Sequence, residues 1–356
     1  MRLLINLSKI GKFPPNIMEK IIYPRLGRKR PEIIVGPGHG LDNAVVQLGH
    51  NQVLVISSDP LSAIPELGMK DSAWLSVHLL ASDLSTCGFP PRFIVTNFSL
   101  PPQMKNEQFE EYWNAFHTEC EKLGIAILGG HTGRYVGADY TVIGGGVMMT
   151  LAPENRYLAA SMAKPGDHII MTKGVAVAAT GILARVFPET VKEAYGLTFF
   201  RKAQEYFYEF SVVKDALTAA SVGLRDDGVT AMHDVTEGGL LGALYELSEA
   251  SKVGLEVNIS DIIVTKEEKL ICDLFSLDPY VTLSEGTLII AVKPSKAQKV
   301  LDALRTKGIQ GKVIGRILDR DGGRWIRKNG RLKPLRKPTV DPYWKAYWKA
   351  YREGWK

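Results

Sequence analysis

The sequence predicts an α/β (α+β) protein with two domains. The chain of 356 residues is long enough for about two hydrophobic cores. Short apolar runs of strand length alternate with amphipathic segments of helix length in both halves. Between the halves, Pro153 and the turn Lys164-Pro165-Gly166-Asp167 mark a boundary. We therefore expect an arm with a short helix over 1–35, domains over 36–155 and 156–335, and a terminal helix over 336–356.

The composition is typical of a globular cytoplasmic protein. The net charge of +6 suits a small polyanionic substrate, but it is too small and too scattered to predict nucleic-acid binding. Cys87, Cys120 and Cys272 form no CxxC pair and predict no disulfide framework, as is usual in a reducing compartment. The start of the chain does not resemble a signal peptide, and no apolar run has the length of a membrane span.

In the first half, a short helix is expected over 16–22, and strands are expected over 45–48, 52–57, 93–100, 125–128 and 140–151. Asp71 is expected to cap a helix that ends at Ser82-Asp83-Leu84. Asn106 is expected to cap a second helix, which Gly124 ends. Because an acidic residue near the C-terminal end of a helix opposes the helix dipole, Asp83 predicts a compensating cation, for which a metal ion is the obvious candidate.

The second half repeats this alternation. Strands are expected over 168–171, 229–233, 287–292 and 313–317, and helices over 174–186, 211–221, 266–275 and 296–306. A further helix is expected after the turn Asp234–Leu240, and Asn329-Gly330 predicts a hairpin. After Asp341, aromatic residues recur at helical spacing with lysines between them, which favours a docked helix. A basic-aromatic contact to a partner, a membrane surface or nucleic acid is the alternative.

The stretch Gly36-Pro37-Gly38-His39-Gly40-Leu41-Asp42 is the leading candidate site. Its alternating glycines allow the backbone to approach a ligand, and their amides form a nest for phosphate oxygens. Asp42 offers a hard oxygen ligand for the Mg²⁺ that accompanies a nucleotide. The spacing matches neither GxGxxG nor a P-loop, and a Gly/Pro turn before an apolar strand explains the stretch equally well.

Two further stretches are candidates for ligand binding. Asp59 is expected just beyond a strand, where ligands often bind in α/β folds, although an Asp-Pro turn explains it as well. Gly129-Gly130-His131-Thr132-Gly133 is expected to be a second glycine-rich turn. Lys9 and Lys12 of the arm have the reach to contact phosphates, but lysines near a terminus more often only increase solubility.

Taken in order, these motifs resemble those of the aminoimidazole ribonucleotide (AIR) synthase-like, or PurM-like, ATP-binding superfamily. The superfamily includes selenophosphate synthetase, thiamine-monophosphate kinase and the hydrogenase maturation factor HypE. The likeness spans roughly residues 8–318 and is nearest to HypE and the AIR-synthase-related proteins. The residues on which it rests are Lys9-Ile10-Gly11-Lys12-Phe13-Pro14, Gly36–Val46, Ser58-Asp59-Pro60, Ser82-Asp83-Leu84, Gly129-Gly130-His131-Thr132, Ala231–Leu240, Asp278-Pro279 and Ser284-Glu285-Gly286.

The resemblance implies a PurM-like fold in which the N-terminal strands of two subunits form a barrel in a homodimer, with ATP in a cleft near that interface. It implies that Asp42, Asp59 and Asp83 hold Mg²⁺ and are catalytic. Carboxylates gathered in this way would repel one another, so their cluster indicates cations. The residues implied to contact the nucleotide are Gly36, Gly38, His39, Gly40, Asp42, Gly129, Gly130, His131, Thr132, Asp234, Glu237 and Gly238.

The implied chemistry is ATP-dependent activation of an amide- or carboxylate-like oxygen on a small-molecule or protein-borne substrate. HypE acts on a thiocarboxamide carried by its own C-terminal cysteine. This sequence ends Arg352-Glu353-Gly354-Trp355-Lys356, so we do not expect that reaction on its own terminus, and a role in hydrogenase maturation stays open.

Several alternatives remain. One is a small-metabolite kinase resembling thiamine-monophosphate kinase, and another is a non-catalytic nucleotide-binding scaffold that acts through the aromatic tail. His131 stands where several members have an acidic residue, so it is a poor Mg²⁺ ligand. A zinc site formed by His39, His131 and His233 has no ligand spacing in its favour.

Overall fold

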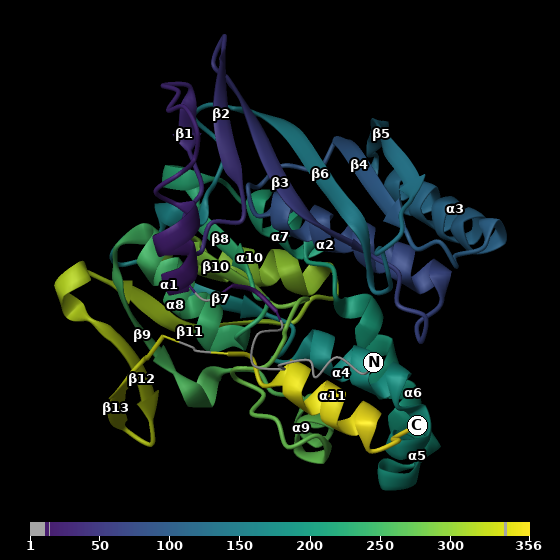
Figure 1. Ribbon diagram of the computed structural model, residues 1–356. Helices are drawn as coiled ribbons and strands as arrows, with labels where there is room; N and C mark the ends of the chain where they lie inside the picture. Colours follow the sequence, from purple (N-terminus) through teal and green to yellow (C-terminus); the bar gives the residue numbers. More distant parts are fainter. Residues whose placement is uncertain (1–10, 14, 338–339) are drawn as a thin grey trace.

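Two mainly antiparallel sheets, one in each half of the chain, form the framework of the protein (Figure 1). The computed structural model describes residues 11–13, 15–337 and 340–356. Residues 1–10 of the predicted arm, including Lys9 and Ile10, therefore lie outside the described residues, as does Pro14. The expected short helix is present as α1 (Pro15–Ile17), which continues as the π-helical turn η2 (Met18–Ile22).

The N-terminal sheet has the strand order β1-β2-β3-β6-β4-β5. Only β4 and β5 are parallel, and α3 (Asn106–Leu123) connects them. With α2 (Met69–Ser85), α3 covers one face of the sheet. The strands are β1 (Ile33–Val35), β2 (Ala44–Gly49), β3 (Gln52–Ser62), β4 (Phe93–Leu100), β5 (Ala126–Arg134) and β6 (Val142–Pro153).

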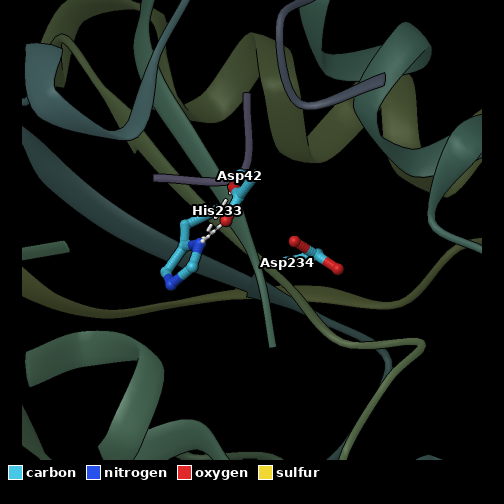
Figure 2. Close-up of side chains that lie close together, drawn as sticks. All are labelled: Asp42, His233 and Asp234. Atoms are coloured by element: carbon cyan, nitrogen blue, oxygen red, sulfur yellow. Dashed lines mark hydrogen bonds and ion pairs between the residues drawn. The ribbon is translucent and has the colours of Figure 1, made fainter. Parts of the chain in front are cut away.

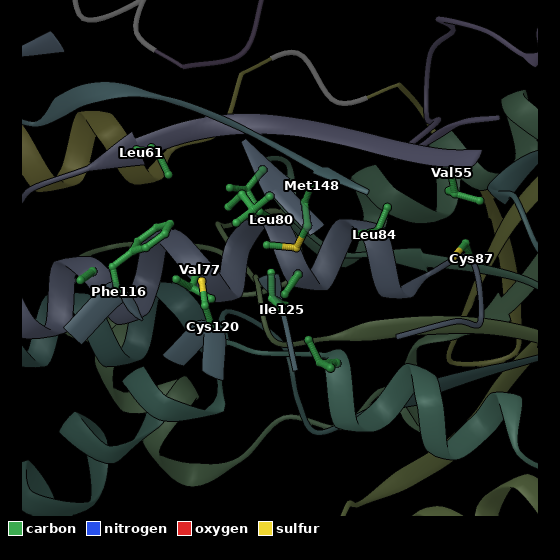
Figure 3. Packing of buried hydrophobic residues seen from close by; sticks show 14 of the residues in the cluster. Val55, Leu61, Val77, Leu80, Leu84, Cys87, Phe116, Cys120, Ile125 and Met148 are labelled. Atoms are coloured by element: carbon green, nitrogen blue, oxygen red, sulfur yellow. The ribbon is translucent and has the colours of Figure 1, made fainter. Parts of the chain in front are cut away.

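The core of this half lies between the sheet and its two helices (Figure 3). Burial alternates along β3, where Val53, Val55, Ser57 and Leu61 face the helices. Since side chains alternate between the two faces of a strand, Asp59 points to this same face, toward α2. The helices contribute Val77, Leu80, Leu84, Phe116 and Cys120 to this core.

The C-terminal sheet has the strand order β13-β12-β9-β11-β7-β10-β8. Helices cover both faces, which is why β8 and β10 are buried along their whole length. One face packs on α8 (Gly239–Ser251), and the other packs on α7 (Val213–Ala220) and α10 (Pro294–Thr306). The strands are β7 (His168–Thr172), β8 (Val229–Asp234), β9 (Gly254–Asn258), β10 (Leu288–Val292), β11 (Gly311–Leu318), β12 (Arg324–Lys328) and β13 (Arg331–Pro334).

A separate helical core includes the predicted terminal helix, α11 (Tyr343–Arg352), which docks through Tyr343, Tyr347 and Ala350. Figure 1 shows α11 beside α4 and α9. The other helices of this core are α4 (Val177–Val186), α5 (Pro188–Tyr195), α6 (Leu197–Glu205) and α9 (Lys266–Leu274). Short 3-10 turns complete the chain: η3 (Ala160–Met162), η4 (Tyr206–Glu209), η5 (Arg225–Asp227), η6 (Ile259–Asp261) and η7 (Arg320–Gly322).

Four local predictions were wrong. Asn106 does not cap α3 but is its first residue, and Lys105 occupies the N-cap position. Asp59 lies inside β3, because the strand continues through Pro60 to Ser62 in its pairing with β6. The stretch 129–133 is part of β5 and not a turn, because it pairs with β4. Asp71 does not cap α2, which begins at Met69. The Asp71 carboxylate instead pairs with Arg185 of α4.

The expected barrel stays a prediction. Within the described part of the chain, β1 and β5 are the two edges of an open sheet. The division into domains over 36–155 and 156–335 likewise stays a proposal. The second span contains the whole C-terminal sheet, and the first contains the N-terminal sheet except β1, which lies just before residue 36. Across the residues that the structure describes, no helix combines the length and the apolar character needed to cross a membrane.

Candidate functional site

Acidic side chains from several elements gather where the glycine-rich loop meets both halves of the protein. Asp42 comes from the loop between β1 and β2, Asp59 from β3, and Asp83 from the last turn of α2. Asp234 ends β8, and Glu246 lies on α8. These five residues are called the acidic cluster below. The structure thus brings the three predicted metal ligands, Asp42, Asp59 and Asp83, near Asp234, whose carboxylate is close enough to raise the pKa of all three.

His233 contacts two members of the acidic cluster, Asp42 and Glu246, and Figure 2 shows its contact with Asp42. Its Nδ1 lies 2.7 Å from Oδ1 of Asp42, and its Nε2 lies 3.1 Å from Oε2 of Glu246. Burial alone would lower the pKa of His233, but the two carboxylates raise it well above its ordinary value. Burial would raise the pKa of Glu246, yet the hydrogen bond and the charge of His233, together with the charges of Lys12 and His39, outweigh burial and lower that pKa. His233 is therefore a buried imidazolium that donates to both carboxylates.

The negative charges of Asp59 and Asp83 are poorly compensated by the groups around them. Burial and the neighbouring carboxylate of Asp234 raise the pKa of Asp83 well above the ordinary value. Burial also raises the pKa of Asp42 and of Asp59 to about 6 in each case. The hydroxyl of Ser57 donates to Asp83 Oδ2 at 3.2 Å. The chain therefore holds these carboxylates where their charge is costly, which is the expected signature of a cation site.

Asp234 has an unused ligand atom. It is 3% exposed, and its Oδ1 has no hydrogen-bond partner in the described structure. Single donor atoms of Asp42, His233 and Asp234 lie within 4.8 Å of one another. Both nitrogens of His233 already face carboxylates, so oxygen atoms are the donors on offer. A set of carboxylate oxygens suits a hard divalent cation such as Mg²⁺ better than zinc.

A lysine of the arm reaches the acidic cluster. Lys12 Nζ donates to Thr236 Oγ1 at 2.8 Å. Desolvation opposes its charge, but Glu246, Asp83, Asp234 and Asp59 together raise the pKa of Lys12 above its ordinary value. The main-chain N–H of Lys12 donates to Glu237 Oε2 at 2.7 Å. Thr236 therefore holds the Lys12 ammonium group near enough to the acidic cluster for the carboxylates to stabilise its charge, so Lys12 does more than increase solubility.

The predicted phosphate-binding glycines have neighbours of their own. Gly40 has φ +72°, and a Cβ there would lie 2.6 Å from the carbonyl oxygen of Glu246, so this glycine allows the loop to pack on α8. The N–H of Gly238, expected to face an anion, donates to Asp341 Oδ2 at 2.7 Å. That part of the predicted anion site is occupied by a carboxylate of the chain itself. His39 lies at the margin, where burial lowers its pKa despite nearby Glu246.

Within one chain, the residues predicted on the 129–133 stretch lie away from the acidic cluster. Gly129, Gly130, His131 and Thr132 belong to β5, which β4 and β6 separate from β3. At the usual strand spacing, three steps amount to about 14 Å. Thr132 lines a different hollow of about 350 Å³ with Phe109, Trp113 and Arg134, and His131 hydrogen-bonds Tyr135. Their role in binding a nucleotide stays a prediction.

Sequence reasoning considered His233 only as a zinc ligand, and it missed both the contacts of His233 with carboxylates and the role of Glu246. His233 directly precedes Asp234 in a motif already singled out, so its position held a usable signal. Glu246 lies in the middle of an ordinary amphipathic helix, and only the packing of α8 against the loop 36–43 shows its role.

Comparison with known proteins gives two family matches. The family model described as AIR synthase related protein, N-terminal domain, matches residues 40–149, and the one described as AIR synthase related protein, C-terminal domain, matches residues 164–328. The carbamoyl dehydratase HypE of Escherichia coli is 26% identical over 275 residues, which cover 75% of this chain and 76% of the relative.

Solved structures share the fold. One is a HypE–HypF complex, with a TM-score of 0.70 and 18% identity, covering 90% of this chain and 99% of that chain. A second is HypE in complex with ATP, with a TM-score of 0.62 and 19% identity, covering 96% of this chain and 99% of that chain. A third is thiamine-monophosphate kinase from Aquifex aeolicus, with a TM-score of 0.63 and 15% identity, covering 82% of this chain and 92% of that chain.

Proposed function

The chain belongs to the AIR synthase related protein family, and on that premise we propose that it is an ATP- and Mg²⁺-dependent enzyme. It would phosphorylate, and so activate, an amide- or carboxylate-like oxygen of its substrate. The family match covers 110 residues of the first half (40–149) and 165 of the second (164–328). The name of the HypE relative, carbamoyl dehydratase, supports an amide-like substrate.

The acidic cluster is the observation on which the proposal rests. Asp42, Asp59 and Asp83 would hold Mg²⁺, with the free Oδ1 of Asp234 as a further ligand. When bound, Mg²⁺ and ATP supply the transferable phosphoryl group and neutralise its charge. His233 keeps the Asp42 carboxylate oriented, and Thr236 holds the Lys12 ammonium group where it can attract an anionic phosphate.

The acceptor would come from another molecule. All three cysteines of the sequence, Cys87, Cys120 and Cys272, are buried, and burial raises the pKa of Cys87 and Cys120 to about 12. None of them offers an accessible thiolate to carry an acceptor group. We therefore propose a small-molecule or protein-borne acceptor, to be sought first among carboxamides. A solved HypE–HypF complex supports a protein partner for this family, and hydrogenase maturation is the process that we would test first.

A homodimer is part of the proposal. The face of the N-terminal sheet opposite α2 and α3 presents apolar side chains that are only partly covered. These are Leu54, Ile56, Val95, Val147 and Met149. A contiguous apolar face of this kind supports contact with a second copy, in which β5 of one subunit would approach the acidic cluster of its partner.

Calorimetric titration of ATP with and without Mg²⁺, followed by a phosphate-release assay, tests the proposal. We expect Mg²⁺-dependent binding and slow turnover in the wild type, and loss of turnover in Asp42→Asn. Asp321→Asn, an exposed change on η7, is the matched control. Wild-type turnover in Asp42→Asn would overturn the site assignment. ATP binding without turnover under any acceptor would favour a nucleotide-binding scaffold.

A kinase is the second candidate, favoured by the shared fold of thiamine-monophosphate kinase. The two reactions differ in their products. A kinase leaves a stable phosphorylated product, whereas oxygen activation releases ADP and phosphate with a dehydrated or otherwise altered acceptor. Phosphorus NMR of the reaction mixture therefore distinguishes them.

A further inference from the structure

The segment after Asp341 contacts the turn that connects β8 to α8, the same turn that carries Asp234, Thr236 and Glu237. Asp341 is 7% exposed. Its Oδ2 accepts from the N–H of Gly238 at 2.7 Å, and its Oδ1 accepts from the N–H of Tyr343 at 2.8 Å. One buried carboxylate therefore joins the start of α11 to the start of α8. A negative charge at both helix starts is electrostatically favourable.

Trp344, three residues after Asp341, makes a second connection. Its Nε1 donates to Glu237 Oε1 at 3.1 Å, while the other oxygen of Glu237 accepts from the N–H of Lys12. The three segments meet closely, because a Cβ on Gly11 would lie 2.7 Å from Glu237 Oε2 and 3.1 Å from Trp344 Nε1. Gly11 also has φ +101°, so both its conformation and its surroundings favour glycine.

The helix α11 is anchored in the helical core. Tyr343 and Tyr347 are buried in the helical core with Phe187 and Phe275, so α11 is held independently of its contacts to the turn. The family match ends at residue 328, so α11 lies beyond it.

We propose that residues 341–352 form a clamp that positions the β8–α8 turn and the arm, and through them the Lys12 ammonium group, beside the acidic cluster. Asp341 and Trp344 are positioning residues, because they act through Gly238 and Glu237. The inference rests on the proposed function for its effect on catalysis, but the clamp itself is a structural claim. One consequence is that the Gly238 amide serves the chain's own carboxylate and is not available to a bound phosphate.

The chain offers a matched pair of variants. Trp344 and Trp348 lie on the same helix and are both partly buried, but Trp348 Nε1 has no hydrogen-bond partner in the described structure. Trp344→Phe and Trp348→Phe remove the same atoms, and only the first removes the bond to Glu237. A difference between them therefore reports the clamp and not the loss of indole volume.

The first measurement is amide hydrogen exchange of residues 11–13 and 236–240 in metal-free protein. We expect exchange in these segments to accelerate about threefold to tenfold in Trp344→Phe, the range for losing one hydrogen bond of ordinary net strength. Trp348→Phe should match the wild type. Equal exchange in both variants would overturn the clamp, and this result does not depend on whether the protein turns over ATP.

The second measurement is steady-state kinetics with Mg²⁺ and ATP. A clamp that positions Lys12 predicts a KM for ATP that rises about threefold to tenfold in Trp344→Phe, with kcat changed less and an unaltered melting temperature relative to Trp348→Phe. Asp341→Asn, which keeps the shape of the side chain, should change KM in the same direction. Wild-type KM in both Trp344→Phe and Asp341→Asn would show that the contacts have no catalytic consequence and would overturn that part of the inference.

Discussion

Replacing Asp59 with asparagine should make the metal-free protein more stable while it removes function. No hydrogen bond within the described residues stabilises the charged form of Asp59. Burial raises its pKa from the ordinary 3.8 to about 6, with Asp234 and Glu237 adding to the shift and Lys12 opposing it. The difference of about 2.2 pKa units corresponds to about 3 kcal/mol at neutral pH. Since the side chain is partly exposed, solvent screening reduces the expected gain to about 1–2 kcal/mol.

The pH dependence gives this prediction its sign. A raised folded-state pKa means that the protonated carboxyl contributes stability below pH 3.8, and that this stability is lost as the pH rises through about 6. The asparagine side chain of the variant cannot ionise and loses nothing. The free energy of unfolding of Asp59→Asn should therefore equal that of the wild type near pH 4, exceed it increasingly up to pH 6, and stay higher by a constant amount above pH 6.

Urea denaturation in EDTA at several pH values measures this difference, with the exposed Asp321→Asn as the control. Addition of Mg²⁺ should stabilise the wild type more than Asp59→Asn, because the variant lacks one proposed ligand. The reasoning fails if Asp59→Asn is less stable than the wild type at pH 7.5 in EDTA. It also fails if the full gain is already present at pH 4.

Two further substitutions test other features. His233→Gln should lower the free energy of unfolding by about 3 kcal/mol in EDTA at pH 6, because it leaves Asp42 and Glu246 without their buried cation. Since the pKa of His233 is raised, its contribution is fully present below the ordinary value of 6.5 and is lost progressively as the pH rises toward the raised pKa, so the loss should be smaller at pH 7.5 than at pH 6. Gly130→Ala should lower the free energy of unfolding by more than about 3 kcal/mol in the same assay, because its Cβ would lie 1.9 Å from the carbonyl oxygen of Thr96. Gly137→Ala, also at positive φ but with open space around it, should cost only about 1 kcal/mol. Similar losses in the two variants would refute the steric argument.

The regular elements were predictable where the local pattern was strong. The strand over 93–100 and the helix that begins at Asn106 and ends before Gly124 agree with β4 and α3. Both have clean periodicity and clear end signals. The helices α5 and α6 were not predicted, because each is short, and their apolar residues pack in a core formed mainly by α4, α9 and α11.

The glycine-rich stretches show the limit of local reasoning. A run such as 129–133 suggests a turn by composition, yet its backbone pairs with β4, and close packing against Thr96 explains Gly130. The three predicted metal ligands do lie in one cluster. They could be selected from the sequence because the order of the motifs along the chain and the family resemblance were enough to identify them. Glu246, and Gly238 as a partner of Asp341, depend on contacts between distant segments, which spacing along the chain cannot reveal.

The contacts that close the site also say something about when it forms. Lys12 and Glu237 are 225 residues apart in sequence, and Glu237 and Trp344 are 107 residues apart. Within the sheets, β2 and β3 are joined by a two-residue turn, and the most distant paired residues, His168 of β7 and Arg316 of β11, are 148 residues apart (316 minus 168), so the Lys12–Glu237 contact spans more of the chain than any sheet pairing of the described residues. Contacts of such high sequence separation form only after much chain entropy has been lost, so they come late in folding and open early when the chain is stressed. Both sheets should therefore be able to exist before the protein can bind its substrate, and mild denaturant should abolish activity before it melts either sheet.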